Sequence, residues 1–303
     1  MLCEISSFGG FLPTWASLTL IGLTLTGSMS AWLFYQYYGV PTYARWRRKS
    51  NPEYPEPEMV RREVITMLKG MGVATIPPAL SLSLIDSGWS QGYCGVGDYG
   101  VGYLVLSFFA VWIGSDFLEF YYHRLGHVFR RAWREHKSHH VFHNPSPFAV
   151  IADGYVDQFM RALPMLLFPL VMPMNIDLLF FTFAIFFYGY GVYLHWGHEL
   201  SWPDAHHPWF NTSFQHYIHH ARSTLHRPYH TGFFFKLWDR AFGSVYDDPC
   251  VCARCACERG QRSQEAWRLV KKPDYAVLLR PSYWLPGGPR PSGANAGEAS
   301  GAS

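Results

Sequence analysis

Charged side chains are scarce in this chain of 303 residues. Lys, Arg, Asp and Glu together make up 16% of the sequence, against roughly 25% in an ordinary soluble domain. The net charge of +3 is small, and no basic stripe interleaved with aromatic residues is present that could follow a phosphate backbone. The composition therefore argues against a nucleic-acid-binding protein, and the shortage of charge favours a membrane protein.

Cysteine is sparse as well, and it is unevenly placed. Of six cysteines, Cys3 and Cys94 are isolated, and the other four crowd between Cys250 and Cys257. This is not the spacing of a secreted disulfide framework. The N-terminus also lacks the basic start and small-residue cleavage site of a signal peptide. We therefore expect its apolar stretch to remain in the protein as a membrane anchor.

Long stretches of the chain carry no charge. None lies between Glu4 and Arg45, and Trp15–Tyr35 is long enough to cross a bilayer. Shorter uncharged runs follow at Gly70–Ile85, Tyr99–Ser115, Ala162–Ile176 and Leu178–Trp196. Lys and Arg gather after the first run, before the second and after the third, with none in Ser87–Gly100. By the positive-inside rule this predicts a lumenal N-terminus, five crossings and a cytosolic C-terminal half. The last two runs form a hairpin turning near Pro173, or alternatively a re-entrant pair.

The domain organisation follows from these runs. We expect membrane spans and a lumenal loop in residues 1–100, a catalytic domain in 101–248 and a Cys-rich extension in 249–285. Residues 286–303 are mostly Gly, Pro, Ala and Ser, a composition that buries too little apolar surface to order. We predict that this tail is disordered.

Histidine is absent from the first 122 residues and the last 73, so all 15 lie between His123 and His230. His123 and His127 are four residues apart, and the segments 136–140 and 216–220 both read H-x-x-H-H. On a helix, residues three and four apart share one face. A lone histidine is more often a surface or capping residue, but that interpretation does not explain three such groups beside membrane spans. The pattern predicts a metal site, and more than six imidazoles favour two ions over one.

The metal is not fixed by the ligand type, because imidazole suits zinc, copper, iron and nickel alike. A hydrolytic zinc site usually brings a carboxylate, as in H-E-x-x-H, and that motif is missing. Glu135 adjoins His136, but adjacent residues of a helix point about 100° apart. Glu135 is therefore either solvated or a residue that hydrogen-bonds to a ligand. A metal pair under apolar helices faces lipid C–H bonds, which favours iron and O2 chemistry. The alternatives are a membrane metal transporter, whose histidines would line the spans, and a zinc-dependent membrane hydrolase.

Five motifs in a fixed order carry a family resemblance. They are HRLGH (123–127), HKSHH (136–140), HWGHE (195–199), HYIHH (216–220) and FFFKLWDRAFGS (233–244). This set resembles the fatty acid hydroxylase superfamily, which includes sterol desaturases, sterol methyl oxidases and sphingolipid hydroxylases. The resemblance covers roughly residues 101–247. It implies a non-haem centre of two iron ions, replaceable by zinc in preparations, and the use of O2. It also implies electrons from NAD(P)H through cytochrome b5, and residence in the endoplasmic reticulum.

The resemblance also implies which histidines are ligands. They are His123, His127, His136, His139, His140, His195, His216, His219 and His220. His198 is either a further ligand or a residue that supports one. We interpret His226 and His230 as residues of a local loop. His143, His206 and His207 are capping or loop residues, or residues that support a ligand. A metal-bound histidine usually donates its other ring N–H to a carboxylate or carbonyl, and the candidate carboxylates are Asp153, Asp157, Glu199, Asp204 and Asp239.

Three features stand apart from this pattern. The segment 221–237 is longer than is usual in the family, and His230 stands where an Asn-aromatic-Gly motif is common. Asp116 and Glu119, one turn apart at the end of the third run, are interpreted as interfacial carboxylates. The run CVCARCAC (250–257) contains the spacing of one zinc knuckle in Cys252 and Cys255, but a whole site within eight residues is cramped. Palmitoylation or no specific role remain equally open.

Taken together, the sequence predicts an all-α, polytopic membrane protein with a cytosolic, histidine-rich helical cap that holds a di-metal site. We expect an oxidoreductase that hydroxylates or desaturates a sterol, fatty acyl chain or sphingolipid at the cytosolic membrane face.

Overall fold

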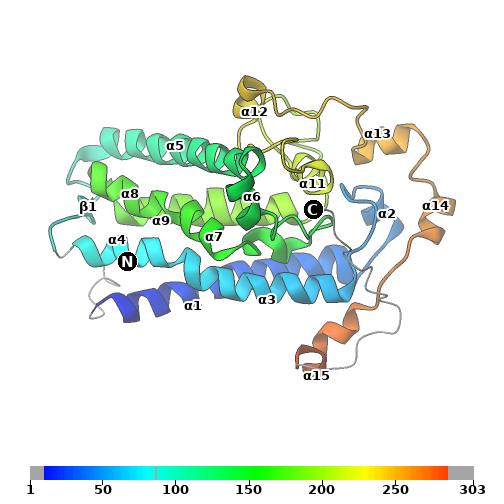
Figure 1. Cartoon of the computed structure of the whole chain (residues 1–303), viewed down its shortest axis with the longest axis horizontal. Helices are drawn as coiled ribbons and strands as arrows, with labels where there is room; N and C mark the ends of the chain where they lie inside the picture. The colour runs from blue at the N-terminus through cyan, green and yellow to red at the C-terminus, as the bar shows by residue number, and fades with distance from the viewer. Residues whose placement is uncertain (1–9, 86, 286–303) are drawn as a thin grey trace.

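Four long apolar helical segments form the body of the structure, a computed structural model that describes residues 10–85 and 87–285. Figure 1 shows them running side by side along the long axis of the molecule. They span Phe11–Gly39, Pro57–Ile85, Gly100–Val128 and Ile176–His195, and each is long and apolar enough to cross a membrane. The mostly helical architecture confirms the predicted fold class.

Local sequence explains where these segments bend. The first is helix α1 (Phe11–Phe34) continued by a π-helical turn, η2 (Tyr35–Gly39). The second joins α3 (Pro57–Ala74) to α4 (Ile76–Ile85), and the joint falls where Pro77 and Pro78 remove two backbone N–H donors. The third is the single helix α5 (Gly100–Val128). The fourth joins α9 (Ile176–Thr182), the π-helical η4 (Phe183–Gly189) and α10 (Tyr190–His195).

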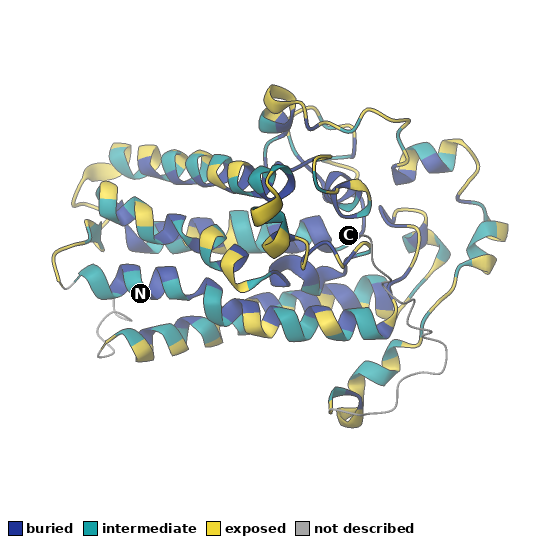
Figure 2. Ribbon diagram, in the orientation of Figure 1, coloured by how far each residue is buried: buried dark blue, intermediate teal, exposed yellow. Residues whose placement is uncertain are grey.

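The outer surfaces of these helices are apolar, as lipid contact requires. Large side chains such as Leu20, Leu25 and Leu106 are more than 60% exposed, and Figure 2 shows exposed positions recurring along α1 and α5. A soluble monomer rarely leaves such an extended apolar surface in water. The chain is therefore an integral membrane protein.

No single long helix forms over Ala162–Ile176. This stretch follows α7 (Tyr155–Ala162) and contains only the eight-residue α8 (Pro164–Val171) and the strand β2 (Met174–Asn175). Helix α8 alone rises about 12 Å, but α7 and α8 are joined by Leu163 in a helical conformation, and together they rise about 25 Å. They return the chain to the far end of the bundle, where β2 pairs in parallel with β1 (Gly92–Tyr93).

The opposite end of the bundle carries a helical cap. It contains α2 (Tyr43–Trp46), α6 (Arg130–His136), the 3-10 turn η3 (Pro147–Ile151), α11 (Ser213–Arg222) and α12 (Lys236–Phe242). The chain then wraps around this end through α13 (Ala253–Glu258), α14 (Gln264–Leu269), η5 (Tyr275–Leu279) and α15 (Pro281–Trp284). Cys3 and the tail 286–303, predicted to be disordered, lie outside the described residues.

The cap is fixed to the bundle by a shared core. Met67 and Met71 of α3 pack with Val150 and Ile151 of η3 and with Val192 of α10. Helix α11 begins in a capping box, in which Thr212 and Gln215 satisfy each other's backbone N–H groups. The shared core and the capping box therefore fix the ends of the helices that carry the histidines.

Candidate metal centre

The nine histidines predicted to be ligands come together at the junction of the bundle and the cap. They come from the last turns of α5, the end of α6, the turn after it, the end of α10 and one side of α11. All are buried, with at most 8% of any residue exposed: His123, His127, His136, His139, His140, His195, His216, His219 and His220. Segments almost 100 residues apart in the sequence thus supply a single cluster.

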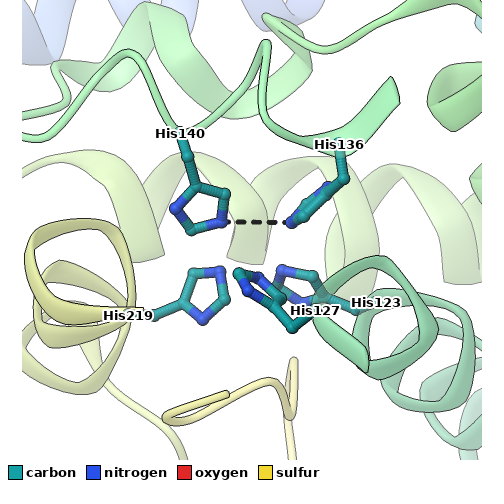
Figure 3. A group of neighbouring side chains, drawn as sticks. All are labelled: His123, His127, His136, His140 and His219. Carbon is teal, nitrogen blue, oxygen red and sulfur yellow. Dashed lines mark hydrogen bonds between the residues drawn. The ribbon is translucent and has the colours of Figure 1, made fainter. Parts of the chain in front are cut away.

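These imidazoles form two adjacent groups, each able to hold one ion. The first consists of His123, His127, His136, His140 and His219, whose rings point toward one another (Figure 3). The second consists of His139, His195, His216 and His220. Within each group the candidate ligand atoms lie within 4.8 Å of one another. The groups adjoin, since the ring centroids of His140 and His220 are 5.3 Å apart.

Six of the nine rings use Nδ1 to contact an oxygen that can only accept a hydrogen bond. The pairs are His123 with Thr231 O (3.0 Å), His127 with Thr224 O (3.2 Å), His136 with Asp157 Oδ2 (3.1 Å), His139 with Asp153 Oδ1 (2.5 Å), His195 with Gly191 O (2.7 Å) and His219 with Tyr229 O (2.7 Å). Carbonyl and carboxylate oxygens do not donate, so Nδ1 carries the proton in each ring. The lone pair on Nε2 is left to face the interior of the cluster, as metal ligation requires.

The Nε2 atoms fit a metal by two further criteria. Those of His123, His127 and His219 are buried without a hydrogen-bond partner in the described structure, an arrangement that buried polar atoms rarely adopt. Others lie close together, at 3.1 Å for His136 and His140. In the second group, Nε2 of His216 lies 2.9 Å from that of His195 and 3.2 Å from that of His220. Ligands about 2.1 Å from one ion would be separated by about 3.0 to 3.4 Å, so both groups suit a bound ion.

Burial keeps the cap histidines in the form that binds metals. Desolvation lowers the pKa of His136, although its hydrogen bond to Asp157 opposes the shift. Burial places the pKa values of His140, His216 and His219 well below their ordinary value, and neighbouring imidazoles lower them further. Neutral imidazole is the ligating form.

A buried ion-pair network supports the second group. Asp153 contacts His139 through one oxygen, and its other oxygen accepts from Arg161 Nη1 at 2.5 Å. Arg161 also pairs with Glu119 Oε1 at 2.7 Å. Burial opposes ionisation, but His139 and Arg161 hold the pKa of Asp153 below its usual range. Glu119 and Asp116 are both buried within the protein, and Asp116 accepts from Phe234 N, Phe235 N and Trp238 Nε1.

Other expected residues lie apart from the two groups. The ring of His198 stacks near Tyr37, with centroids 4.2 Å apart. Glu135 is exposed. His226 and His230 are loop residues with positive φ, 66° and 46°. Of the carboxylates proposed to orient ligands, only Asp153 and Asp157 do so. The remaining three serve other bonds: Glu199 accepts from Ala253 N, Asp204 pairs with Arg254, and Asp239 accepts from Gly232 N.

Sequence reasoning missed the backbone of the long segment after α11. Carbonyls of Thr224, Tyr229 and Thr231 orient three of the histidines. No residue type marks a carbonyl acceptor, so the only available signal was the unusual length of this segment. The extra residues wrap the loop back over the first histidine group.

A small cavity lies behind the second group. Glu119 and Arg161 form a polar part of its wall, and Phe183, Phe187 and Phe233 form an apolar part. Arg161 connects this cavity to the cluster, because it binds the carboxylate that contacts His139. Mostly apolar walls with a few fixed polar groups are typical of small-molecule sites.

Several known proteins are similar in sequence to this chain. A family model described as fatty acid hydroxylase matches residues 108–244. Lathosterol oxidase from Mus musculus is 28% identical over 229 residues, which is 74% of each chain. Delta(7)-sterol 5(6)-desaturase erg31 from Schizosaccharomyces pombe is 30% identical over 240 residues, covering 77% of this chain and 74% of the relative. The corresponding enzyme ERG3 of Saccharomyces cerevisiae is 28% identical over 77% of this chain and 60% of its own. No solved structure matches.

Proposed function

Because this chain belongs to the fatty acid hydroxylase family, we propose that it is a membrane-bound, non-haem di-iron oxygenase that introduces a double bond into a sterol. It is a lipid-modifying oxidoreductase, and the relatives named above are sterol oxidases and desaturases. The observation that carries the proposal is the pair of adjacent, buried imidazole groups whose Nε2 atoms face inward.

The nine histidines are the proposed ligands, one ion to each group. Two iron ions held there supply the O2-dependent chemistry that breaks an unactivated C–H bond. The chain's own contribution is to hold the ligands still. Asp153 and Asp157 fix the tautomers of His139 and His136, and such partners fix the orientation of a ligand and raise its basicity. The buried setting also excludes water from the reacting lipid.

The overall reaction balances with one external electron donor. Reducing one O2 to two waters takes four electrons and four protons. Forming a carbon–carbon double bond removes two hydrogen atoms from the sterol, which supply two of each. The remaining two electrons come from NAD(P)H through cytochrome b5, and two protons come from water. An electron-donor protein is therefore a required partner.

The cavity behind the second group is the proposed place for the reacting end of the lipid. Its volume is only about 40 Å³, so side chains of its wall such as Phe183 and Phe187 would have to move to admit part of a sterol.

We place the histidine end in the cytosol of cells and the protein in the endoplasmic reticulum. The cationic segments 45–49, 61–62 and 124–137 all lie toward the histidine end, whereas residues 87–100 at the β1 end carry no Lys or Arg. Lys and Arg favour the cytosolic side. Cys94, at the β1 end, is disulfide-bonded, which agrees with an oxidising lumen on that side.

The test is sterol profiling by mass spectrometry in cells that lack their own sterol desaturase. Expression of the protein should consume a saturated precursor and yield its product with one further double bond. His139→Ala and His216→Ala should abolish the product while the protein still inserts into membranes. His143→Ala is the matched control, because this histidine is exposed and outside both groups.

Three outcomes would contradict the proposal. Full activity in His139→Ala would contradict the assignment of the histidines as metal ligands. Cleavage of a lipid substrate without O2 or an electron donor, with no desaturated sterol formed, would favour the zinc-dependent hydrolase. A hydroxylated acyl chain or sphingolipid, with no change in sterols, would leave the centre intact but reject the sterol substrate.

A further inference from the structure

A second set of metal-binding side chains lies outside the nine-histidine centre. Its members, here called the Cys/His cluster, are His206, Cys250, Cys252 and Cys255. Their ligand atoms lie within 4.8 Å of one another. His206 comes from a loop 44 residues before Cys250, and the sequence had predicted for it a capping, loop or ligand-supporting role. The histidine supplies the distant ligand that the crowded cysteine run lacks.

The spacing of these atoms matches the edges of a tetrahedron. His206 Nε2 lies 3.4 Å from the Sγ atoms of Cys252 and Cys255, and 3.8 Å from that of Cys250. Zinc binds sulfur at about 2.3 Å and nitrogen at about 2.0 to 2.1 Å, so a nitrogen–sulfur edge around it measures about 3.6 Å. The three observed distances bracket this value.

We propose that the Cys/His cluster binds one structural zinc ion. Three thiolates and one imidazole in tetrahedral order are a set that selects zinc. All four ligand positions are filled by protein, which is characteristic of a structural rather than a catalytic site. The three cysteines are not paired in disulfides, so their sulfur atoms are free to coordinate.

The surrounding backbone supports thiolate ligands. The amide of Cys252 donates to Cys250 Sγ at 3.5 Å, and the amide of Cys255 donates to Cys252 Sγ at 3.4 Å. Two further bonds fix the segments that meet at the cluster. Ala253 N donates to Glu199 Oε1 at 2.7 Å, and Arg254 pairs with Asp204 at 2.8 Å. His206 and Cys252 also line one surface pocket, which gives an ion a path of entry.

The position of the cluster gives the ion a structural task. Cys252 is fully buried and packs with Ala205 and with Phe214 and Ile218 of α11. The same helix carries His216, His219 and His220 on its other positions. Zinc here would tie the loop 199–207 and helix α13 against the outer side of α11, and so brace the helix that supplies three ligands to the oxygenase centre.

The experiment measures metals in the full-length protein, purified in detergent without metal-affinity resins. Elemental mass spectrometry should find about one zinc per chain that Cys255→Ser removes. Cys257→Ser is the matched control, since Cys257 lies in the same helix but outside the cluster and contacts Arg47 O instead. Control protein should keep its zinc.

Cobalt distinguishes this site from the histidine groups, which also accept zinc. Co²⁺-loaded protein should show thiolate-to-cobalt charge-transfer absorption, because only the Cys/His cluster contains sulfur. His139→Ala should keep this absorption and Cys255→Ser should lose it, so failure of the oxygenase proposal and of this one are separable. In alkylation with iodoacetamide, Cys250 and Cys255 should be protected in wild-type protein and Cys257 modified, although all three are partly exposed.

The proposal is overturned if wild-type protein shows no thiolate–cobalt absorption. It is also overturned if Cys257→Ser loses as much zinc as Cys255→Ser, or if mass spectrometry finds Cys252 or Cys255 palmitoylated or disulfide-linked in the isolated protein. Should Cys255→Ser fail to accumulate, the alkylation pattern of wild-type protein with and without a zinc chelator decides. Chelation that leaves the modification of Cys250 and Cys255, the two partly exposed cluster cysteines, unchanged would reject the site.

Discussion

Asp153→Asn should weaken the second histidine group while preserving the shape of the side chain. Asp153 contacts three donors, the Nδ1–H of His139, the guanidinium of Arg161 and the side-chain amide of Gln158. The first two of these groups can only donate. An amide has one accepting oxygen and one donating nitrogen. Either orientation of the substituted amide therefore sets a donor against a donor. A charge-assisted hydrogen bond contributes about 1.5–3 kcal/mol, which corresponds to a roughly 10- to 100-fold loss of metal affinity at this group.

Asp157→Asn provides a graded comparison in the first group. Asp157 faces His136 Nδ1–H at 3.1 Å and the hydroxyl of Tyr122 at 2.6 Å. A hydroxyl can accept as well as donate, so the amide nitrogen has a partner while the amide oxygen still serves His136. We expect a loss of less than about ten-fold. Glu135→Gln removes the same charge beside the centre but from an exposed residue, and should change nothing.

The assay is competition with a chromophoric chelator, read as metal retained per chain, alongside sterol product formation. Circular dichroism and thermal unfolding in detergent confirm that each variant is folded. The reasoning fails if Asp153→Asn retains metal as strongly as Glu135→Gln. It also fails if Asp153→Asn and Asp157→Asn lose affinity equally, because the donor-only surroundings of Asp153 would then not matter.

Two further variants test the geometry of the site. A Cβ on Gly126 would lie 3.0 Å from the ring of His136, so Gly126→Ala should displace this ligand by a few tenths of an ångström and reduce turnover about ten-fold; Gly102→Ala, with open space in the same helix, should keep full activity. His230→Asn should keep the fold, because Asn tolerates a φ of 46°. Burial lowers the pKa of His230 to about 3, so between pH 6.5 and 3 this side chain is protonated in the unfolded chain but not in the folded one. The difference lowers the free energy of unfolding as the pH falls, by up to about 1.4 kcal/mol per pH unit. Because His230→Asn removes this difference, thermal unfolding of the variant should depend less on pH over that range.

Local patterns in the sequence were enough to locate the spanning helices and the histidine motifs. Uncharged runs near 20 residues long are rare outside membrane-spanning helices, so the first and third spans were found. Both helices extend further than the uncharged runs that predicted them. The run Ala162–Ile176 does not form one long helix, because Pro164 and Pro169 limit helix length, which hydropathy alone does not register. The fourth span was found because its run continues without interruption to His195.

The sequence by itself determined the chemistry available to this protein, because ligand type and helical spacing are properties of neighbouring residues. Only the tertiary structure decided how the ligands divide. In HKSHH, His136 and His140 join the first group while His139 joins the second, and in HYIHH only His219 crosses to the first. That division depends on how α5, α6, α10 and α11 pack. The same holds for His206, which meets three cysteines more than 40 residues away, since residues far apart in sequence become neighbours only through the path of the folded chain.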